Sequence, residues 1–68
     1  MNPRYFARSA SDKDDNWPYW FVADRERGGL NVTADLVRKH INPNHHGATL
    51  CIPDFAREIA ALANEAAK

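Results

Sequence analysis

The stretch WPYWFVADRERGG, residues 17–29, decides how this sequence folds. Four of the seven aromatic residues of the chain fall within its first five positions, and aromatic residues favour β-strands. The pair Gly28-Gly29 permits the positive φ angles that a sharp chain reversal needs. We therefore predict a strand over Trp17–Arg25 with a tight turn at its end, and we place Pro18 at the start of the strand or at an edge-facing position.

Such a strand cannot bury all of its aromatic residues on one side, because successive side chains point to opposite faces of a sheet. One face would carry Trp17, Tyr19 and Phe21, and the other would carry Trp20 and Val22. We expect Trp20 and Val22 to point into the core, because water satisfies the hydroxyl of Tyr19 more easily. The expected core is completed by six further apolar residues, namely Phe6, Leu50, Ile52, Phe55, Ile59 and Leu62.

Two further strands are predicted on either side of this one. The segment Arg4–Ser9 is rich in aromatic and small residues, and the polar run SASDKDDN (residues 9–16) that ends it is typical of a turn. The segment Ala48–Ile52 follows the loop NPNHHG and is expected to form the third strand.

The middle segment, residues 30–41, fits two patterns. As a helix it would have Thr33 as its N-cap and one apolar stripe made of Leu36, Val37, His40 and Ile41. As a strand it would alternate Leu30, Val32, Ala34 and Leu36 and pair with the preceding strand across the two glycines. The cap and the spacing favour a short helix.

The C-terminal segment from Pro53 onward is predicted to be a long helix. It contains six alanines and no glycine, and its proline stands at the first position, where a helix tolerates it. A core-facing stripe is expected at i, i+4, i+7 and i+11, formed by Phe55, Ile59, Leu62 and Ala66.

These elements predict a single small α+β domain over residues 1–68. It would have a small antiparallel three-stranded sheet, a short middle helix, and a long C-terminal helix packed on one face of the sheet. A domain of this size is marginally stable, so we expect oligomerisation or a tightly packed aromatic core to support it.

Composition and motifs argue against several functions. Nine basic and nine acidic residues cancel, whereas a nucleic-acid binder usually has a net basic field. Cys51 is the single cysteine, and the spacing of His40, His45, His46 and Cys51 matches no structural zinc pattern. No catalytic motif is present, so we expect no enzyme activity, no metal site and no cofactor. No apolar run is long enough for a membrane span, and we expect a cytoplasmic protein.

The best candidate for a functional site is the outward face of the aromatic strand. We predict a binding surface of five residues: Tyr5, Trp17, Tyr19, Phe21 and Arg25. Tyrosine, tryptophan and arginine dominate the energetic centres of protein interfaces, which favours another protein or a second copy of the chain as the partner. The alternative is a purely structural role, in which the short helix or a second copy of the chain covers this face.

A second functional hypothesis is binding of single-stranded nucleic acid. In it the aromatic residues would stack on bases, and four arginines would contact phosphate groups, namely Arg4, Arg8, Arg25 and Arg27. The neutral charge balance and the acidic residues interleaved with these arginines weigh against it.

Overall fold

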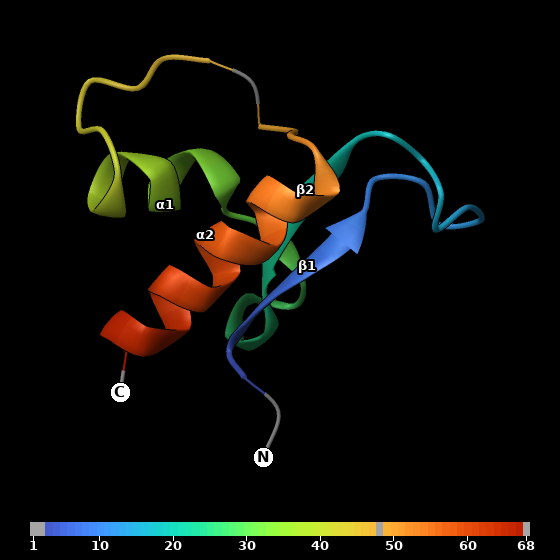
Figure 1. Ribbon diagram of the computed structural model, residues 1–68. Coiled ribbons are helices and arrows are strands. Elements are labelled where there is room, and N and C mark those ends of the chain that lie inside the picture. Colours follow the sequence, from blue (N-terminus) through green and yellow to red (C-terminus); the bar gives the residue numbers. More distant parts are fainter. Residues whose placement is uncertain (1–2, 48, 68) are drawn as a thin grey trace.

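An antiparallel sheet and two helices form the computed structural model, which describes residues 3–47 and 49–67. The elements in chain order are β1 (Tyr5–Ser9), β2 (Trp20–Asp24), the 3-10 helix η1 (Arg25–Arg27), β3 (Leu30–Asn31), α1 (Thr33–His40) and α2 (Pro53–Ala66) (Figure 1). The predicted α+β fold class, with its three-stranded antiparallel sheet and its short and long helices, is confirmed.

The sheet has the order β1-β2-β3, and both neighbouring pairs are antiparallel. In the first pair the register runs from Tyr5 opposite Asp24 to Ser9 opposite Trp20. Side chains of directly opposite residues share a face, so Tyr5, Asp24, Ser9 and Trp20 lie on the same side of the sheet. The register therefore determines which aromatic residues become neighbours.

The turn after β2 forms as predicted, with positive φ angles of 69° at Gly28 and 84° at Gly29. The Asp24 carboxylate accepts a hydrogen bond from the Glu26 backbone and so caps η1. For residues 30–41 the sequence allowed a helix or a strand, and the structure contains one of each. Leu30 and Asn31 pair with β2 as β3, and α1 begins at Thr33.

Thr33 is not the N-cap of α1, as the sequence had suggested, but its first helical residue. Its backbone N–H donates to Asn31 Oδ1 at 3.0 Å, so the side chain of Asn31 satisfies the start of the helix. The Thr33 Oγ1 hydroxyl accepts from the backbone N–H of Val22 at 2.8 Å and donates to Asn31 Oδ1. Thr33 thereby fastens α1 to the central strand.

The predicted third strand over Ala48–Ile52 is wrong. Ala48 lies outside the described residues, and in the rest of the segment only Cys51 pairs with the sheet, as an isolated bridge to Trp20. The two backbone hydrogen bonds of this bridge measure 2.7 and 2.8 Å. The segment cannot continue along β2 because α2 begins at Pro53, and because β3 and Thr33 occupy the rest of that edge.

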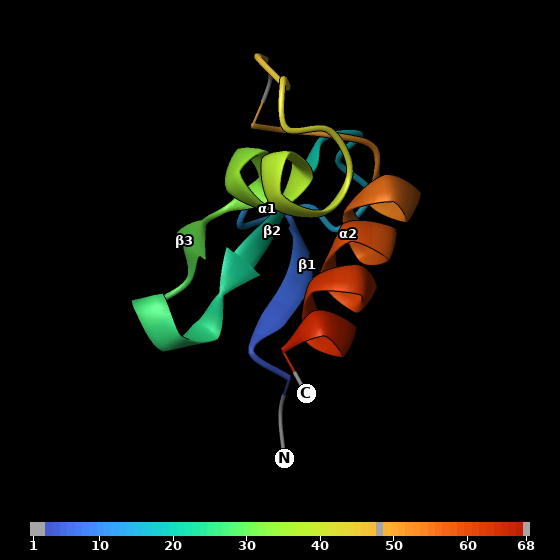
Figure 2. The ribbon, with the colours of Figure 1, turned by 90° about the vertical axis from the view of Figure 1, so that its left-hand side faces the viewer.

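Both helices pack on the same face of the sheet and meet over Val22, which is fully buried. Figure 2 shows α2 alongside β1, with α1 above the strands. From α1 and the residue before it, Val32, Leu36 and Val37 enter this core. From α2 the core receives Ala56, Ile59, Ala60 and Ala63.

The core-facing stripe of α2 therefore differs from the predicted one. Ile59 is buried as expected, but Phe55 is 37% exposed and Leu62 is 49% exposed, and Ala66 also faces solvent. The buried stripe is rotated around the helix and consists mostly of alanine. Small side chains allow the helix backbone to approach β1 and β2 closely, which bulky residues on that stripe would prevent.

Three other residues assigned to the core are also placed differently. Leu50 and Ile52 are exposed. Their segment is joined to the sheet at Cys51, by the bridge to Trp20, and at Thr49, whose carbonyl accepts from Asn31 Nδ2 at 3.1 Å. Phe6 stands opposite Ala23. The neighbouring pair, Tyr5 and Asp24, lies on the helix-covered face, so Phe6 lies on the other face.

The contact between α2 and the edge of the sheet is made by Asn64. Its Oδ1 accepts from the backbone N–H of Tyr5 at 2.9 Å, and its Nδ2 donates to the carbonyl of Tyr5 at 2.8 Å. The side-chain amide thus takes the place of a neighbouring strand at this point of the β1 edge.

Candidate interaction surface

The face of the sheet that lies away from both helices carries aromatic residues and arginines. We call this surface the open face and define it by five residues: Phe6, Arg8, Tyr19, Phe21 and Arg25. Phe6 stands opposite Ala23 and Arg8 stands opposite Phe21, so these residues of β1 and β2 share one side. Tyr19 continues the alternation before β2, and its carbonyl accepts from the backbone N–H of Ala10 at 2.9 Å.

Arginine side chains cover two of the aromatic rings on the open face. The guanidinium carbon of Arg8 lies 5.5 Å from the ring centroid of Phe21, and that of Arg25 lies 4.4 Å from the centroid of Phe6. Both distances allow a cation–π interaction. Phe6 and Phe21 are consequently half-buried although no helix covers them.

Each of these two arginines is held by a second contact. Arg8 forms an ion pair with Asp12, and Arg25 Nε donates to the carbonyl of Pro3 at 3.0 Å. Each guanidinium group thus has a polar partner in addition to the ring beneath it.

Trp17 and Tyr19 form the most exposed part of the surface. Their rings meet edge to face, with centroids 6.5 Å apart and planes inclined at 66°. Trp17 is 43% exposed and Tyr19 is 54% exposed. They extend the open face beyond the first residue of β2, which is Trp20.

The structure thus brings together four of the five predicted site residues, namely Trp17, Tyr19, Phe21 and Arg25. The placement of Tyr5 was wrong. Tyr5 stands opposite Asp24 on the helix-covered face, where it packs against the core. Its hydroxyl-bearing ring also lies beside Arg4, whose guanidinium carbon is 5.1 Å from the ring centroid.

Phe6 and Arg8 are members of the open face that the sequence reasoning missed. Alternation along β1 requires either Tyr5 and Ala7 or Phe6 and Arg8 to share a side with Phe21. Only the register between β1 and β2 decides between the two sets, and this register depends on how many residues the connecting turn uses.

The other end of β1 carries an ion-pair cluster on the helix-covered face. Arg4 donates through Nε and Nη2 to the two carboxylate oxygens of Asp24, each at 3.0 Å, and its Nε lies 3.1 Å from Glu26. These hydrogen bonds from Arg4 hold the pKa of the Asp24 carboxyl below its ordinary value, although burial acts in the opposite direction. They also raise the pKa of the Arg4 guanidinium.

Among residues 3–47 and 49–67, no three histidine, cysteine, aspartate or glutamate side chains gather closely enough to hold a metal ion. Burial raises the pKa of the Cys51 thiol, which disfavours the reactive thiolate form.

A second apolar strip runs along the outer side of α2 and contains Phe55 and Leu62. A hollow of about 550 Å³ on this side is lined by Glu58, Ala61, Leu62 and Glu65, all from one helix. This strip is separate from the open face, because α2 lies on the opposite side of the sheet.

Comparison of the chain with protein-family models, with curated proteins and with solved structures found no match. None of the helices in the described residues combines the length and the apolar character needed to cross a lipid bilayer.

Proposed function

We propose that the chain is a small, non-catalytic interaction module that binds another protein, or a second copy of itself, through the open face and the adjoining Trp17. The observation that carries this proposal is the position of the helices. Both pack on the Val22 side of the sheet, so among the described elements no helix covers the aromatic residues on the other side.

The chemistry of the open face suits a protein partner. Contiguous exposed aromatic residues are uncommon on proteins that bind nothing, and Tyr, Trp and Arg contribute most to interface energies. Arg8 and Arg25 are already held over rings by Asp12 and Pro3. Binding would therefore cost less side-chain entropy than it would for free arginines.

Single-stranded nucleic acid is less well supported as a partner. Arg4 is paired with Asp24 and Glu26, and Arg8 is paired with Asp12. Two of the four arginines assigned to phosphate groups thus already have carboxylate partners. Tyr5 was one of the residues expected to stack on nucleic-acid bases, but it lies on the opposite face of the sheet.

The proposal is tested by measuring solution mass over a wide concentration range for the wild-type chain, for Tyr19→Ser and for a matched control, Leu62→Ser. Leu62 is an apolar residue of comparable exposure on the opposite side of the molecule. For a self-associating chain, Tyr19→Ser should shift the transition to higher concentration by about tenfold or more, and Leu62→Ser should not.

If the wild-type chain is monomeric throughout, the same three proteins serve as baits with a lysate of the source organism. The proposal expects a partner that wild type and Leu62→Ser retain and Tyr19→Ser loses. Equal retention by all three chains would contradict it. Titration with a single-stranded oligonucleotide completes the test, because salt-sensitive binding that Tyr19→Ser abolishes would favour nucleic acid instead.

A further inference from the structure

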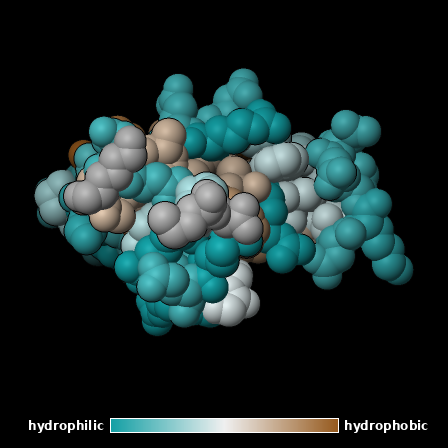
Figure 3. Space-filling model, turned by 90° about the horizontal axis from the view of Figure 1, so that it is seen from below, coloured by the Kyte–Doolittle hydropathy of each residue, from teal (hydrophilic) through white to brown (hydrophobic). Residues whose placement is uncertain are grey.

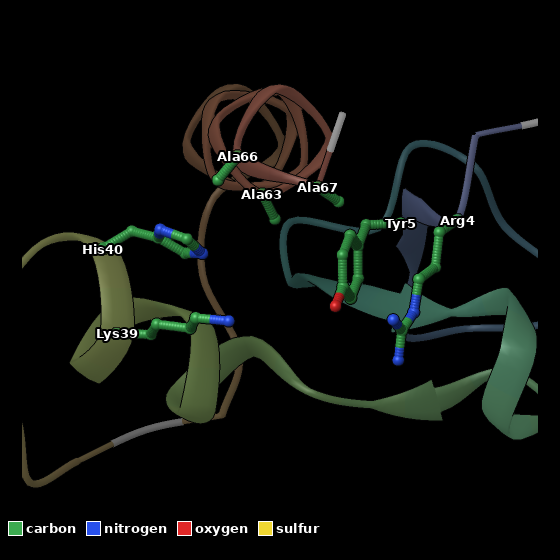
Figure 4. Close-up of a pocket in the computed structure, with 7 residues that line it drawn as sticks. All are labelled: Arg4, Tyr5, Lys39, His40, Ala63, Ala66 and Ala67. Carbon is green, nitrogen blue, oxygen red and sulfur yellow. The ribbon is translucent and has the colours of Figure 1, made fainter.

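A pocket of about 330 Å³ lies where the end of α1, the end of α2 and the start of β1 converge (Figure 4). It is on the helix side of the sheet, away from the open face. Its polar lining consists of Arg4, Tyr5, Lys39 and His40. The volume is within the range of pockets that bind small molecules.

Hydrogen-bond donors approach the pocket from two different elements. Figure 4 shows Lys39 and His40 extending from α1 toward the gap, and the ring of Tyr5 bringing its hydroxyl toward it from β1. Within the described residues, neither Lys39 nor His40 forms a side-chain hydrogen bond or an ion pair. These groups are therefore available to a ligand.

The basic residues of α1 have an ordinary structural role, because the carbonyl end of a helix favours positive charge. That role does not explain why Lys39 and His40 lie in a different environment from Arg38. Arg38, in the same last turn, pairs with Asp35 and does not line the pocket. Lys39 and His40 instead point across a concave space toward a hydroxyl of another element.

Arg4 contributes mainly by positioning. Its Nε and Nη2 are bonded to Asp24, and its guanidinium lies against the ring of Tyr5. The positive charge offered to a ligand is therefore mainly that of Lys39, and His40 adds an imidazole N–H donor. None of the described residues that line the pocket is a carboxylate, and the two carboxylates that contact its lining residue Arg4, those of Asp24 and Glu26, are paired with that arginine.

The remaining lining is apolar and consists of Ala63, Ala66 and Ala67 from α2. Figure 3, in which the molecule is seen from below, shows apolar patches within a largely hydrophilic surface. A ligand in this pocket would thus meet cationic donors on one side and methyl groups on the other.

We propose that this pocket binds a small organic anion, a carboxylate or phosphate that carries a compact apolar group. The anionic oxygens would accept hydrogen bonds from Lys39, His40 and the Tyr5 hydroxyl, and the apolar group would pack on the alanines of α2. This proposal does not depend on the function of the open face.

The test is a titration of the isotope-labelled full chain, followed by NMR, with four probes: benzoate, phenyl phosphate, inorganic phosphate and neutral benzyl alcohol. Benzoate or phenyl phosphate should give saturable shifts at Lys39, His40, Tyr5 and Ala66. Benzyl alcohol and inorganic phosphate should each bind at least about tenfold more weakly, since each lacks one of the two recognised groups.

Two variants test whether Lys39 and Tyr5 contribute to binding. Lys39→Gln should weaken binding of the organic anions by about tenfold, because it removes a charged donor, whereas the matched control Lys13→Gln should leave binding unchanged. Tyr5→Phe keeps the ring and the fold and should weaken binding by about threefold.

Four outcomes would overturn the proposal. The first is the absence of saturable shifts with both organic anions at millimolar concentration. The second is benzyl alcohol binding as tightly as benzoate, which would make the pocket a purely apolar cleft. The third is inorganic phosphate binding as tightly as phenyl phosphate, and the fourth is equal weakening by Lys39→Gln and Lys13→Gln, which would indicate a general charge effect.

Discussion

The two faces of the sheet differ in what covers them. On the helix-covered face, Val22 is fully buried beneath alanines of α2. On the open face, Phe6 and Phe21 remain half-exposed beneath arginines. Large apolar side chains thus lie on both faces of the sheet, so hydrophobicity alone does not decide which face is buried.

The same contrast runs around α2. Its inner stripe of Ala56, Ala60 and Ala63 surrounds one large residue, Ile59, whereas Phe55 and Leu62 face outward. A helix that packs closely on a sheet needs small residues at most contact positions, and one large residue then fills the space that remains. Burial in so small a domain is governed by this fit.

The largest effect is expected at Ile59, which is 1% exposed. Ile59→Ala should lower the free energy of unfolding by about 2–5 kcal/mol, because it opens a cavity that the surrounding alanines cannot fill. Leu62→Ala, on the outer side of the same helix, should cost less than about 1 kcal/mol. Urea denaturation measures both values, and equal losses would show that α2 does not pack through the alanine stripe.

A somewhat smaller effect is expected from enlarging that stripe. Ala60→Leu should destabilise the fold by about 1–3 kcal/mol, because the added side chain forces α2 away from the sheet. Ala61→Leu places the same residue at an exposed position of the helix and should be nearly neutral. Thermal unfolding of the pair measures the difference, and a stabilised Ala60→Leu would indicate a loosely packed interface.

Two of the arginine–aspartate pairs, Arg4–Asp24 and Arg8–Asp12, provide the third comparison. Asp24 is buried and bonded to Arg4, which lowers its pKa, so in acid the folded state binds fewer protons than the unfolded chain. Its stabilising contribution is complete above the ordinary aspartate pKa of about 4 and is lost as pH falls through the lowered value. Asp24→Asn should therefore reduce stability at neutral pH and flatten its decline in acid.

Asp12 is the matched control for this experiment, because its pair with Arg8 is exposed on the open face. Asp12→Asn should change stability little at any pH, since solvent screens exposed pairs. Urea titrations at a series of pH values measure both variants. An acid decline that Asp24→Asn leaves unaltered would contradict the role assigned to the buried pair.

The smallest effect on stability is expected at the open face itself. Tyr19→Ser should change the free energy of unfolding by no more than about 0.5 kcal/mol, because Tyr19 is more than half exposed and contacts the edge of Trp17 alone among the described rings. Loss of the folded signal in circular dichroism would show that the aromatic residues of this face support the fold.

Local signals in the sequence were enough for several elements. The aromatic residues of β2, the Gly28-Gly29 turn and the alanine-rich segment after Pro53 each act over a few residues, and each predicted its element. The strand is shorter than predicted, because it covers Trp20–Asp24 and not the whole of Trp17–Arg25. Alternation along the predicted strand grouped Trp17, Tyr19 and Phe21 on one face, and the hydroxyl of Tyr19 favoured the outward side for that face.

Tertiary structure alone decided the features that join these elements. The sequence predicted a third strand at Ala48–Ile52, but the edge of β2 is shared by β3, Thr33 and Cys51, because several segments compete for the same backbone groups. Tyr5 and Phe6 lie on the faces opposite to those predicted for them. The reason is related, since a register shift of one residue moves every side chain of a strand to the other face. In α2 the stripe of alanines is buried because close approach to the sheet, and not the hydrophobicity of single residues, sets the rotation of the helix.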